Sequence, residues 1–148
     1  MESKGIKPRF DFGFGLSYTT FEYSGLKISA SGTGVTVVAM IKNTGGVPGT
    51  EIPQLYLGFP ADAGEPPKVL RGFEEVFLQP GSSSGVTFNL NQRDLRLVPG
   101  SERCIIFLIA DHTDSIWDVP SQSWVRQSGT FTAYVGSAHS DIRLQGTF

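Results

Sequence analysis

The chain has 148 residues, of which 39% are hydrophobic, 18% charged and 11% aromatic, and its formal net charge is −2. These values describe one folded, soluble domain and exclude a disordered chain. Eighteen Gly and nine Pro, beside only two Met, exclude a helical bundle and favour short strands joined by tight turns.

The charge pattern and the apolar runs exclude two classes of partner. No cluster of Lys and Arg exceeds a pair, so the sequence predicts no nucleic-acid contact. No apolar run approaches the roughly 20 residues that span a bilayer, so it predicts no membrane contact. The start of the chain, Met1–Gly5, lacks the apolar core of a secretory signal, and the chain's own localisation stays unassigned.

Residues 1–18 form a lead-in that is rich in Gly and in large apolar side chains. It is too apolar for a solvated linker, so we expect it to pack on a surface that this chain does not supply. The alternative is that the lead-in folds back onto the core of its own domain. The candidate packing residues are Phe10, Phe12, Phe14, Leu16 and Tyr18.

Seven strand-like segments follow, separated by turns rich in Gly, Pro and Asn. The clearest is 35–43, where Val35, Val37, Ala39 and Ile41 share one face. Pro53, near the start of another segment, indicates an edge position or a bulge. The pattern predicts an all-β fold, an immunoglobulin-like β-sandwich of about seven strands. The predicted strands are 20–30, 35–43, 51–59, 69–78, 86–90, 131–135 and 142–148.

Four stretches, in order along nearly the whole chain, resemble the C-terminal fibronectin type III-like domain of family-three glycoside hydrolases, particularly β-glucosidases. They are Phe12–Tyr23 (FGFGLSYTTFEY), Asn43–Tyr56 with its NTG and PQLY motifs, Pro66–Phe73 (PPKVLRGF), and Arg93-Asp94-Leu95 followed by Trp117-Asp118, Trp124-Val125 and Ser128–Phe131.

The resemblance implies that residues 19–148 form a fibronectin type III-like sandwich and that residues 1–18 lead in from catalytic domains that precede it. In that family the nucleophile and the acid/base residue lie on those domains, and nothing in this chain corresponds to them. The chain is therefore expected to be a non-catalytic structural or accessory fragment with no cofactor, whose partners are the catalytic domains of its parent. Such parents hydrolyse terminal β-D-glucosyl residues, as in cellulose breakdown, and are often secreted.

One segment departs from the family pattern. In relatives the Arg-Asp-Leu motif runs almost directly into the Trp-Asp motif, whereas here Arg96–Asp114 intervenes. We interpret residues 96–114 as an insertion that arose from a translated intron or another gene-model error. The alternative is a buried strand, because Cys104–Ala110 is the most apolar run in the chain.

Glycoside hydrolysis needs two carboxylates about 5–10 Å apart across a sugar site. The candidate pairs are Glu74 with Glu75, Asp62 with Glu65, and Asp111 with Asp114. Neighbouring strand residues point to opposite faces, and the loop pairs look merely solvated, so we predict no catalytic residue here.

The remaining candidate sites are weak. Asp111–Asp114 (DHTD) offers too few ligands for a zinc site, and His139-Ser140-Asp141 reads as a turn, so the sequence predicts no metal site. Exposed aromatics can stack on sugars, which leaves an independent carbohydrate-binding or protein-interaction module as the alternative function. Its candidate residues are Trp117, Trp124, Tyr56 and Tyr134, which core packing would equally explain.

Overall fold

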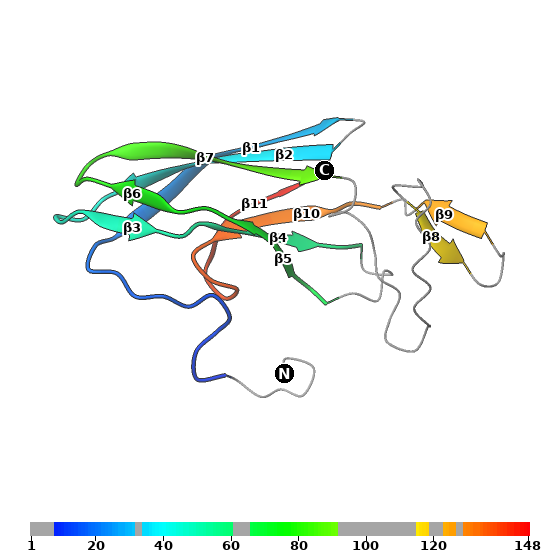
Figure 1. Cartoon of the computed structure of the whole chain (residues 1–148), viewed down its shortest axis with the longest axis horizontal. Helices are drawn as coiled ribbons and strands as arrows, with labels where there is room; N and C mark the ends of the chain where they lie inside the picture. The colour runs from blue at the N-terminus through cyan, green and yellow to red at the C-terminus, as the bar shows by residue number, and fades with distance from the viewer. Residues whose placement is uncertain (1–7, 32–33, 61–65, 92–114, 119–122, 127–128) are drawn as a thin grey trace.

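The computed structural model describes residues 8–31, 34–60, 66–91, 115–118, 123–126 and 129–148. Within these residues every regular element is a β-strand (Figure 1). The strands are β1 (Phe21–Ser31), β2 (Gly34–Asn43), β3 (Gly49–Glu51), β4 (Gln54–Gly58), β5 (Val69–Phe73), β6 (Val76–Leu78), β7 (Ser83–Asn91), β8 (Ser115–Asp118), β9 (Ser123–Arg126), β10 (Thr132–Gly136) and β11 (Ile142–Thr147).

Two antiparallel sheets form the sandwich. One has three strands in the order β1-β2-β7, and the other has four in the order β11-β10-β4-β5. Together they hold the seven strands expected of an immunoglobulin-like fold, so the predicted all-β sandwich is confirmed. Two small antiparallel pairs, β3 with β6 and β8 with β9, add to it.

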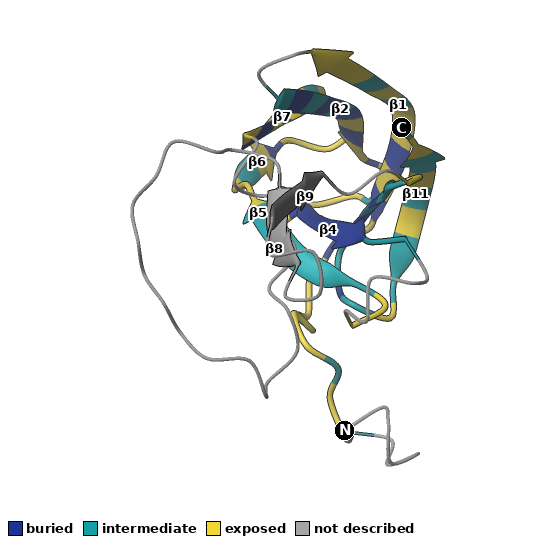
Figure 2. Cartoon of the chain, turned by 90° about the vertical axis from the view of Figure 1, so that its right-hand side faces the viewer, coloured by how far each residue is buried: buried dark blue, intermediate teal, exposed yellow. Residues whose placement is uncertain are grey.

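The core lies between the two sheets, and buried residues alternate with more exposed ones along β2 and β7 (Figure 2). In β2 the predicted alternation holds, because Val35, Val37, Ala39 and Ile41 are all 5% exposed or less. The facing sheet contributes Leu55 and Leu57 from β4 and Ala133 and Val135 from β10, all fully buried, while β7 adds Val86, Phe88 and Leu90 beside β2. Period-two patterning therefore builds both inner faces.

Two predicted strands are each broken in two, at the same level of the fold. The run 51–59 is interrupted at Ile52 and Pro53, between β3 and β4. The run 69–78 is interrupted at Glu74 and Glu75, between β5 and β6. The backbone N–H of Glu74 donates to the carbonyl of Pro53 at 3.1 Å, so the breaks lie side by side. Since β3 pairs with β6 and β4 with β5, the two runs stay paired on both sides of the break.

The buried amide of Asn43 closes the end of β2. Its Oδ1 accepts from the Thr19 hydroxyl at 2.7 Å and from the N–H of Gly45 at 3.0 Å. Its Nδ2 donates to the carbonyls of Val47 and Leu78 at 2.9 and 3.0 Å. The predicted turn after β2 is thus organised by one polar side chain that is itself fully buried and fully bonded.

A bulge interrupts β1 on the free edge of the three-stranded sheet. The register against β2 shifts between Ser24 and Lys27. Gly25 sits within the bulge with φ of +64°, in the left-handed region that favours glycine.

Several sequence predictions concern residues that the structure does not describe. The suspected insertion 96–114 lies outside the described residues, as do Asp62 and Glu65. Trp117 and Trp124 are opposite each other in the β8–β9 register, and their predicted packing stays a prediction. In the described part of the chain, no helix is long and apolar enough to cross a membrane.

Candidate functional site

The lead-in contacts the outer face of the four-stranded sheet, and the side chain of Gln54 holds it there. Gln54 Nε2 donates to the carbonyl of Gly13 at 3.0 Å and to that of Ser137 at 2.7 Å. Its Oε1 accepts from the hydroxyl of Tyr56 at 2.6 Å. Gly13 has φ of +79°, and a Cβ on it would collide with the Gln54 amide, so this contact requires glycine.

The loop between β10 and β11 anchors the lead-in a second time. The backbone N–H of His139 donates to the carbonyl of Phe12 at 2.9 Å, and the Ser140 hydroxyl donates to the Asp11 carboxylate. The His139 ring packs edge-on against Tyr56 with centroids 5.5 Å apart. The predicted turn at 139–141 is therefore part of a loop that contacts the lead-in through the His139 N–H and the Ser140 hydroxyl.

The apolar side chains of the lead-in are exposed although its backbone is held. The exposed fractions are 63% for Phe10, 65% for Phe12, 49% for Phe14, 92% for Leu16 and 102% for Tyr18. The rings of Phe10 and Phe14 contact each other at 5.3 Å, and the N-terminal segment runs away from the sandwich in Figure 1. Among the described residues of the lead-in, these five side chains do not fold back onto the core, which was the alternative, and their packing on another surface stays a prediction.

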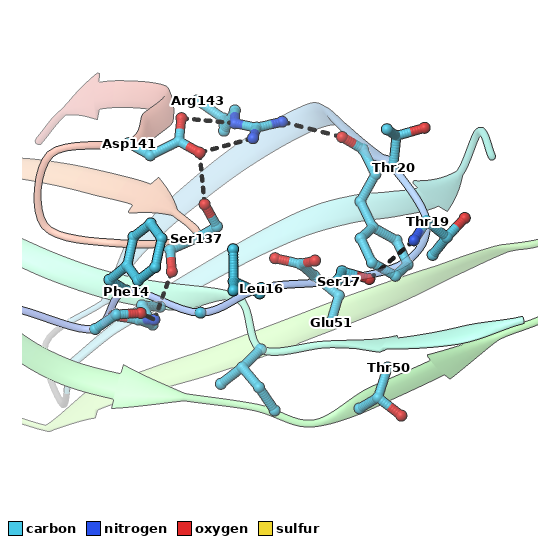
Figure 3. A pocket seen from close by; sticks show the side chains of 15 residues that line it. Phe14, Leu16, Ser17, Thr19, Thr20, Thr50, Glu51, Ser137, Asp141 and Arg143 are labelled. Carbon is cyan, nitrogen blue, oxygen red and sulfur yellow. Dashed lines mark hydrogen bonds and ion pairs between the residues drawn. The ribbon is translucent and has the colours of Figure 1, made fainter. Parts of the chain in front are cut away.

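A pocket of about 470 Å³ lies where the lead-in enters the sandwich (Figure 3). Its walls come from the lead-in, from the start of β1, from the β3–β4 break and from the start of β11. The polar side chains that line it include Glu51, Ser137, Asp141 and Arg143.

Asp141 and Arg143 form a paired contact on one wall of this pocket. Arg143 Nε and Nη2 donate to the two Asp141 oxygens at 2.8 and 2.7 Å, and Arg143 Nη1 donates to the carbonyl of Phe21 at 3.0 Å. The Ser137 hydroxyl also donates to Asp141, at 2.6 Å. The guanidinium beside it, with this hydroxyl, holds the pKa of Asp141 below its ordinary value, so the carboxylate stays ionised.

Glu51 faces the same pocket in a different environment. Its Oε1 accepts from the hydroxyl of Tyr23 at 2.7 Å. Burial raises the pKa of Glu51 above its ordinary value, although the hydrogen bond from Tyr23 and the charge of Arg143 oppose that shift. Burial also raises the pKa of Tyr23, which stays a neutral donor.

The charged side chains of this pocket hold neighbouring segments of the sandwich together. Each Asp141 oxygen already accepts a hydrogen bond from Arg143, and Arg143 reaches across to β1 through Phe21 and packs over the Tyr23 ring at 5.4 Å. The carboxylate pair Glu51 and Asp141 was not found in the sequence. The available signal was the spacing of Asp141 and Arg143, because residues two apart in an extended strand share a face.

The residues singled out in the sequence occupy separate places. Glu74 and Glu75 are exposed at the break between β5 and β6. Tyr56 is 1% exposed, so its ring is closed to a sugar, and Tyr134 is partly buried with the Lys68 ammonium 5.8 Å from its ring centroid. Among the described residues, no group of three or more His, Cys, Asp or Glu side chains could hold a metal ion.

Comparison with known proteins finds similar sequences within β-glucosidases. A model of the fibronectin type III-like domain matches residues 51–106. Probable β-glucosidase L of Aspergillus fumigatus is 42% identical over 99% of this chain, and β-glucosidase cel3A of Pyricularia oryzae is 44% identical over 97% of it. The chain spans only about a fifth of the length of these relatives, 20% and 18% respectively.

Solved structures give the same result. The β-D-glucoside glucohydrolase of Trichoderma reesei matches 99% of this chain with a TM-score of 0.77 at 36% identity. The β-glucosidase D2-BGL of Chaetomella raphigera matches with a TM-score of 0.75 at 40% identity, and the chain covers 21% of each structure. Over nearly its whole length the chain is thus similar to the C-terminal fibronectin type III-like domain of family-three β-glucosidases, and it covers only that part of them.

Proposed function

We propose that this chain is a structural accessory domain that packs its lead-in against the catalytic domains of a β-glucosidase. The observation that carries the proposal is the contrast between a fixed backbone and exposed side chains from Phe10 to Tyr18. Exposed apolar side chains gathered on one segment mark an interaction surface. The relatives hold some four-fifths of their length outside the region that this chain matches, and that length supplies the surface to be covered.

The resemblance to β-glucosidases supports a proposal for the activity of the whole enzyme. A parent of this kind hydrolyses terminal β-D-glucosyl residues of small oligosaccharides with retention of configuration, which would place it in cellulose breakdown. We expect the isolated chain to hydrolyse nothing, because at the pocket Asp141 is bonded to Arg143 and Ser137 and Glu51 accepts from Tyr23. Turnover of an aryl β-glucoside by the purified chain, surviving a second purification step, would contradict this part of the proposal.

A chimeric enzyme tests the packing role. In D2-BGL of Chaetomella raphigera, the matching fifth is replaced by this chain, and Phe12, Leu16 and Tyr18 are changed together to Ser. The expected result is a half-life of aryl-glucosidase activity at elevated temperature that is at least about tenfold shorter, because the loss of interdomain apolar contacts favours separation.

The matched control is Met40→Ser in the same chimera. Met40 is 42% exposed, but it lies on the outer face of the three-stranded sheet, away from the lead-in. We expect this variant to keep the half-life of the unmodified chimera. Equal half-lives for the triple variant and the unmodified chimera would overturn the packing role.

The alternative module that binds carbohydrate has its own test. Cello-oligosaccharides are titrated into the isolated chain while Trp fluorescence is recorded. An unchanged Trp fluorescence supports the structural role, and a saturable change in fluorescence supports sugar binding. The burial of Tyr56 already removes one of the four aromatic side chains that this alternative could use.

A further inference from the structure

Two phenylalanine rings outside the lead-in are exposed to solvent. Phe73 at the end of β5 is 67% exposed and Phe77 in β6 is 61% exposed, whereas Phe88 of β7 is 4% exposed. The packing role of the lead-in does not account for these two rings, because they belong to other elements. Large apolar side chains that gather on one surface mark a place where another surface packs.

The sheet register places Phe73 beside the lead-in. Phe73 is the cross-strand partner of Gln54, so the two side chains share one face of the four-stranded sheet. The neighbouring Gly72 faces the core, because a Cβ there would lie 3.1 Å from the Phe88 ring. Gln54 donates to the carbonyl of Gly13 and so holds the lead-in on the outer face. Phe73 therefore lies next to the point where the lead-in crosses the sheet.

Phe77 lies on the same outer face, beyond the break between β5 and β6. Its neighbours Val76 and Leu78 pack on the core, which directs the Phe77 ring outward. The two broken runs stay paired on both sides of the break, so the outer face continues from β4–β5 onto β3–β6. Ile52 lies at the break, is 39% exposed, and lines the same pocket as Leu16 of the lead-in. The exposed apolar surface of the lead-in thus continues across the break.

The anchoring of the lead-in indicates what covers this surface. The contacts of Gln54 and His139 fix Gly13 and Phe12 on the outer face, so a domain that precedes residue 8 is tethered beside it. The chain matches the C-terminal fifth of its relatives, whose remaining length comes before it. Such a short tether makes the contact intramolecular and raises the effective concentration of the preceding domain far above that of a separate molecule.

We propose that Ile52, Phe73 and Phe77 form a second contact surface for the preceding domain of the parent enzyme. The proposal rests on the proposed function and adds the part of the sandwich on which that domain sits. The partner surface is apolar, because the exposed groups on offer are two aromatic rings and one aliphatic side chain, the residue types of an interface core. Two contacts on different elements fix the orientation of the preceding domain, whereas the lead-in alone would leave it free to swing.

Side-chain labelling by hydroxyl radicals tests this surface in the chimeric enzyme. The labelling rates of Phe73 and Phe77, read by mass spectrometry, are compared between the chimera and the isolated chain. We expect both rates to fall about fivefold in the chimera, because an interface core is packed as densely as a protein interior. Met40 is the control, since it is 42% exposed on the outer face of the other sheet and should be labelled equally in both proteins.

A double variant, Phe73→Thr with Phe77→Thr, measures what the surface contributes to stability. Threonine keeps a high strand propensity, so the thermal midpoint of the isolated chain should shift by less than about 2 °C. In the chimera the half-life of activity at elevated temperature should shorten about tenfold, because apolar contacts with the preceding domain are lost. The matched control, Met40→Thr, should leave both measurements unchanged.

The labelling also separates failure of this surface from failure of the packing role. If Phe12 and Leu16 are protected in the chimera while Phe73 and Phe77 are not, the second surface is wrong and the packing role stands. If none of the four is protected, both are wrong. Protection of the two rings in the isolated chain by cello-oligosaccharides would assign them to a sugar. Protection that rises with the concentration of the isolated chain would assign them to a second copy. Either result would overturn the domain contact.

Discussion

The lead-in and β2 carry the same sequence pattern, but their apolar side chains differ in burial. Each places an apolar side chain at every second position, from Phe10 to Tyr18 and from Val35 to Ile41. In β2 these side chains are 5% exposed or less, whereas in the lead-in none is below 49%. The difference is that β2 lies between β1 and β7 and faces a second sheet, while the described part of the chain supplies no facing sheet to the lead-in. Alternation alone therefore indicates an apolar face, and burial requires a partner for it.

The largest expected effect is in β2. Ile41 is fully buried, so Ile41→Ala should destabilise the isolated chain by about 3 kcal/mol through lost apolar contacts and a cavity. Urea unfolding followed by circular dichroism measures the change. Met40→Ala, in the same strand on the outer face, is the control and should cost less than about 1 kcal/mol. Equal losses would mean that β2 does not face a core.

A smaller effect is expected where the lead-in is anchored. Gln54→Ala leaves the carbonyls of Gly13 and Ser137 without their donor, and should cost about 2 kcal/mol in the isolated chain. Hydrogen exchange should also rise at residues 10–16 and not in β2. The control is Gln145→Ala, which changes an exposed amide on β11. Unchanged exchange in the lead-in would show that Gln54 does not hold it.

A pH-dependent effect of no more than about 1 kcal/mol is expected at the pocket. The folded chain raises the pKa of Glu51 above 4.5, so it binds that proton more tightly than the unfolded chain does. Stability should therefore fall as the pH rises from 4.5 through the raised pKa. Glu51→Gln removes this dependence while still accepting from Tyr23. Asp141, whose pKa is lowered from 3.8, acts only below that window. Identical pH profiles of unfolding for both proteins would contradict the assignment.

The smallest effect on stability is expected for the exposed side chains of the lead-in. Phe12→Ser and Leu16→Ser should each change the stability of the isolated chain by less than about 0.5 kcal/mol, because both side chains are exposed. The same residues should matter in the chimeric enzyme. A loss near that of Ile41→Ala in the isolated chain would show that the lead-in folds onto its own domain in solution.

The strands could be predicted from the sequence where one side chain in two is apolar. The four inward residues of β2 were assigned to one face from their spacing alone, and the predicted strand 86–90 lies within β7, where Val86, Phe88 and Leu90 are buried. The breaks were not predicted. Pro53 gave a local signal in one run, but the matching break at Glu74 depends on a backbone contact between the two runs.

The site could be predicted only in its apolar part. The lead-in residues were singled out because large aromatic side chains are unusual in a linker, and they are exposed here, while their packing against another domain stays a prediction. Gln54, Glu51 and Arg143 were not found, because their roles depend on neighbours that are distant in sequence. Gln54 bonds across 41 residues to Gly13, and Arg143 across 122 residues to Phe21. Spacing rules cannot join polar groups separated by such distances.

The bulge in β1 limits how regularly the edge of the three-stranded sheet can pair with a strand of another molecule. β1 is a free edge, and such edges can pair with strands of other molecules. The shift at Gly25 divides it into Phe21–Ser24 and Lys27–Ser31, so a foreign strand would meet at most five regular residues before the ladder changes register. The irregular edge thus discourages fibre-like growth through β1.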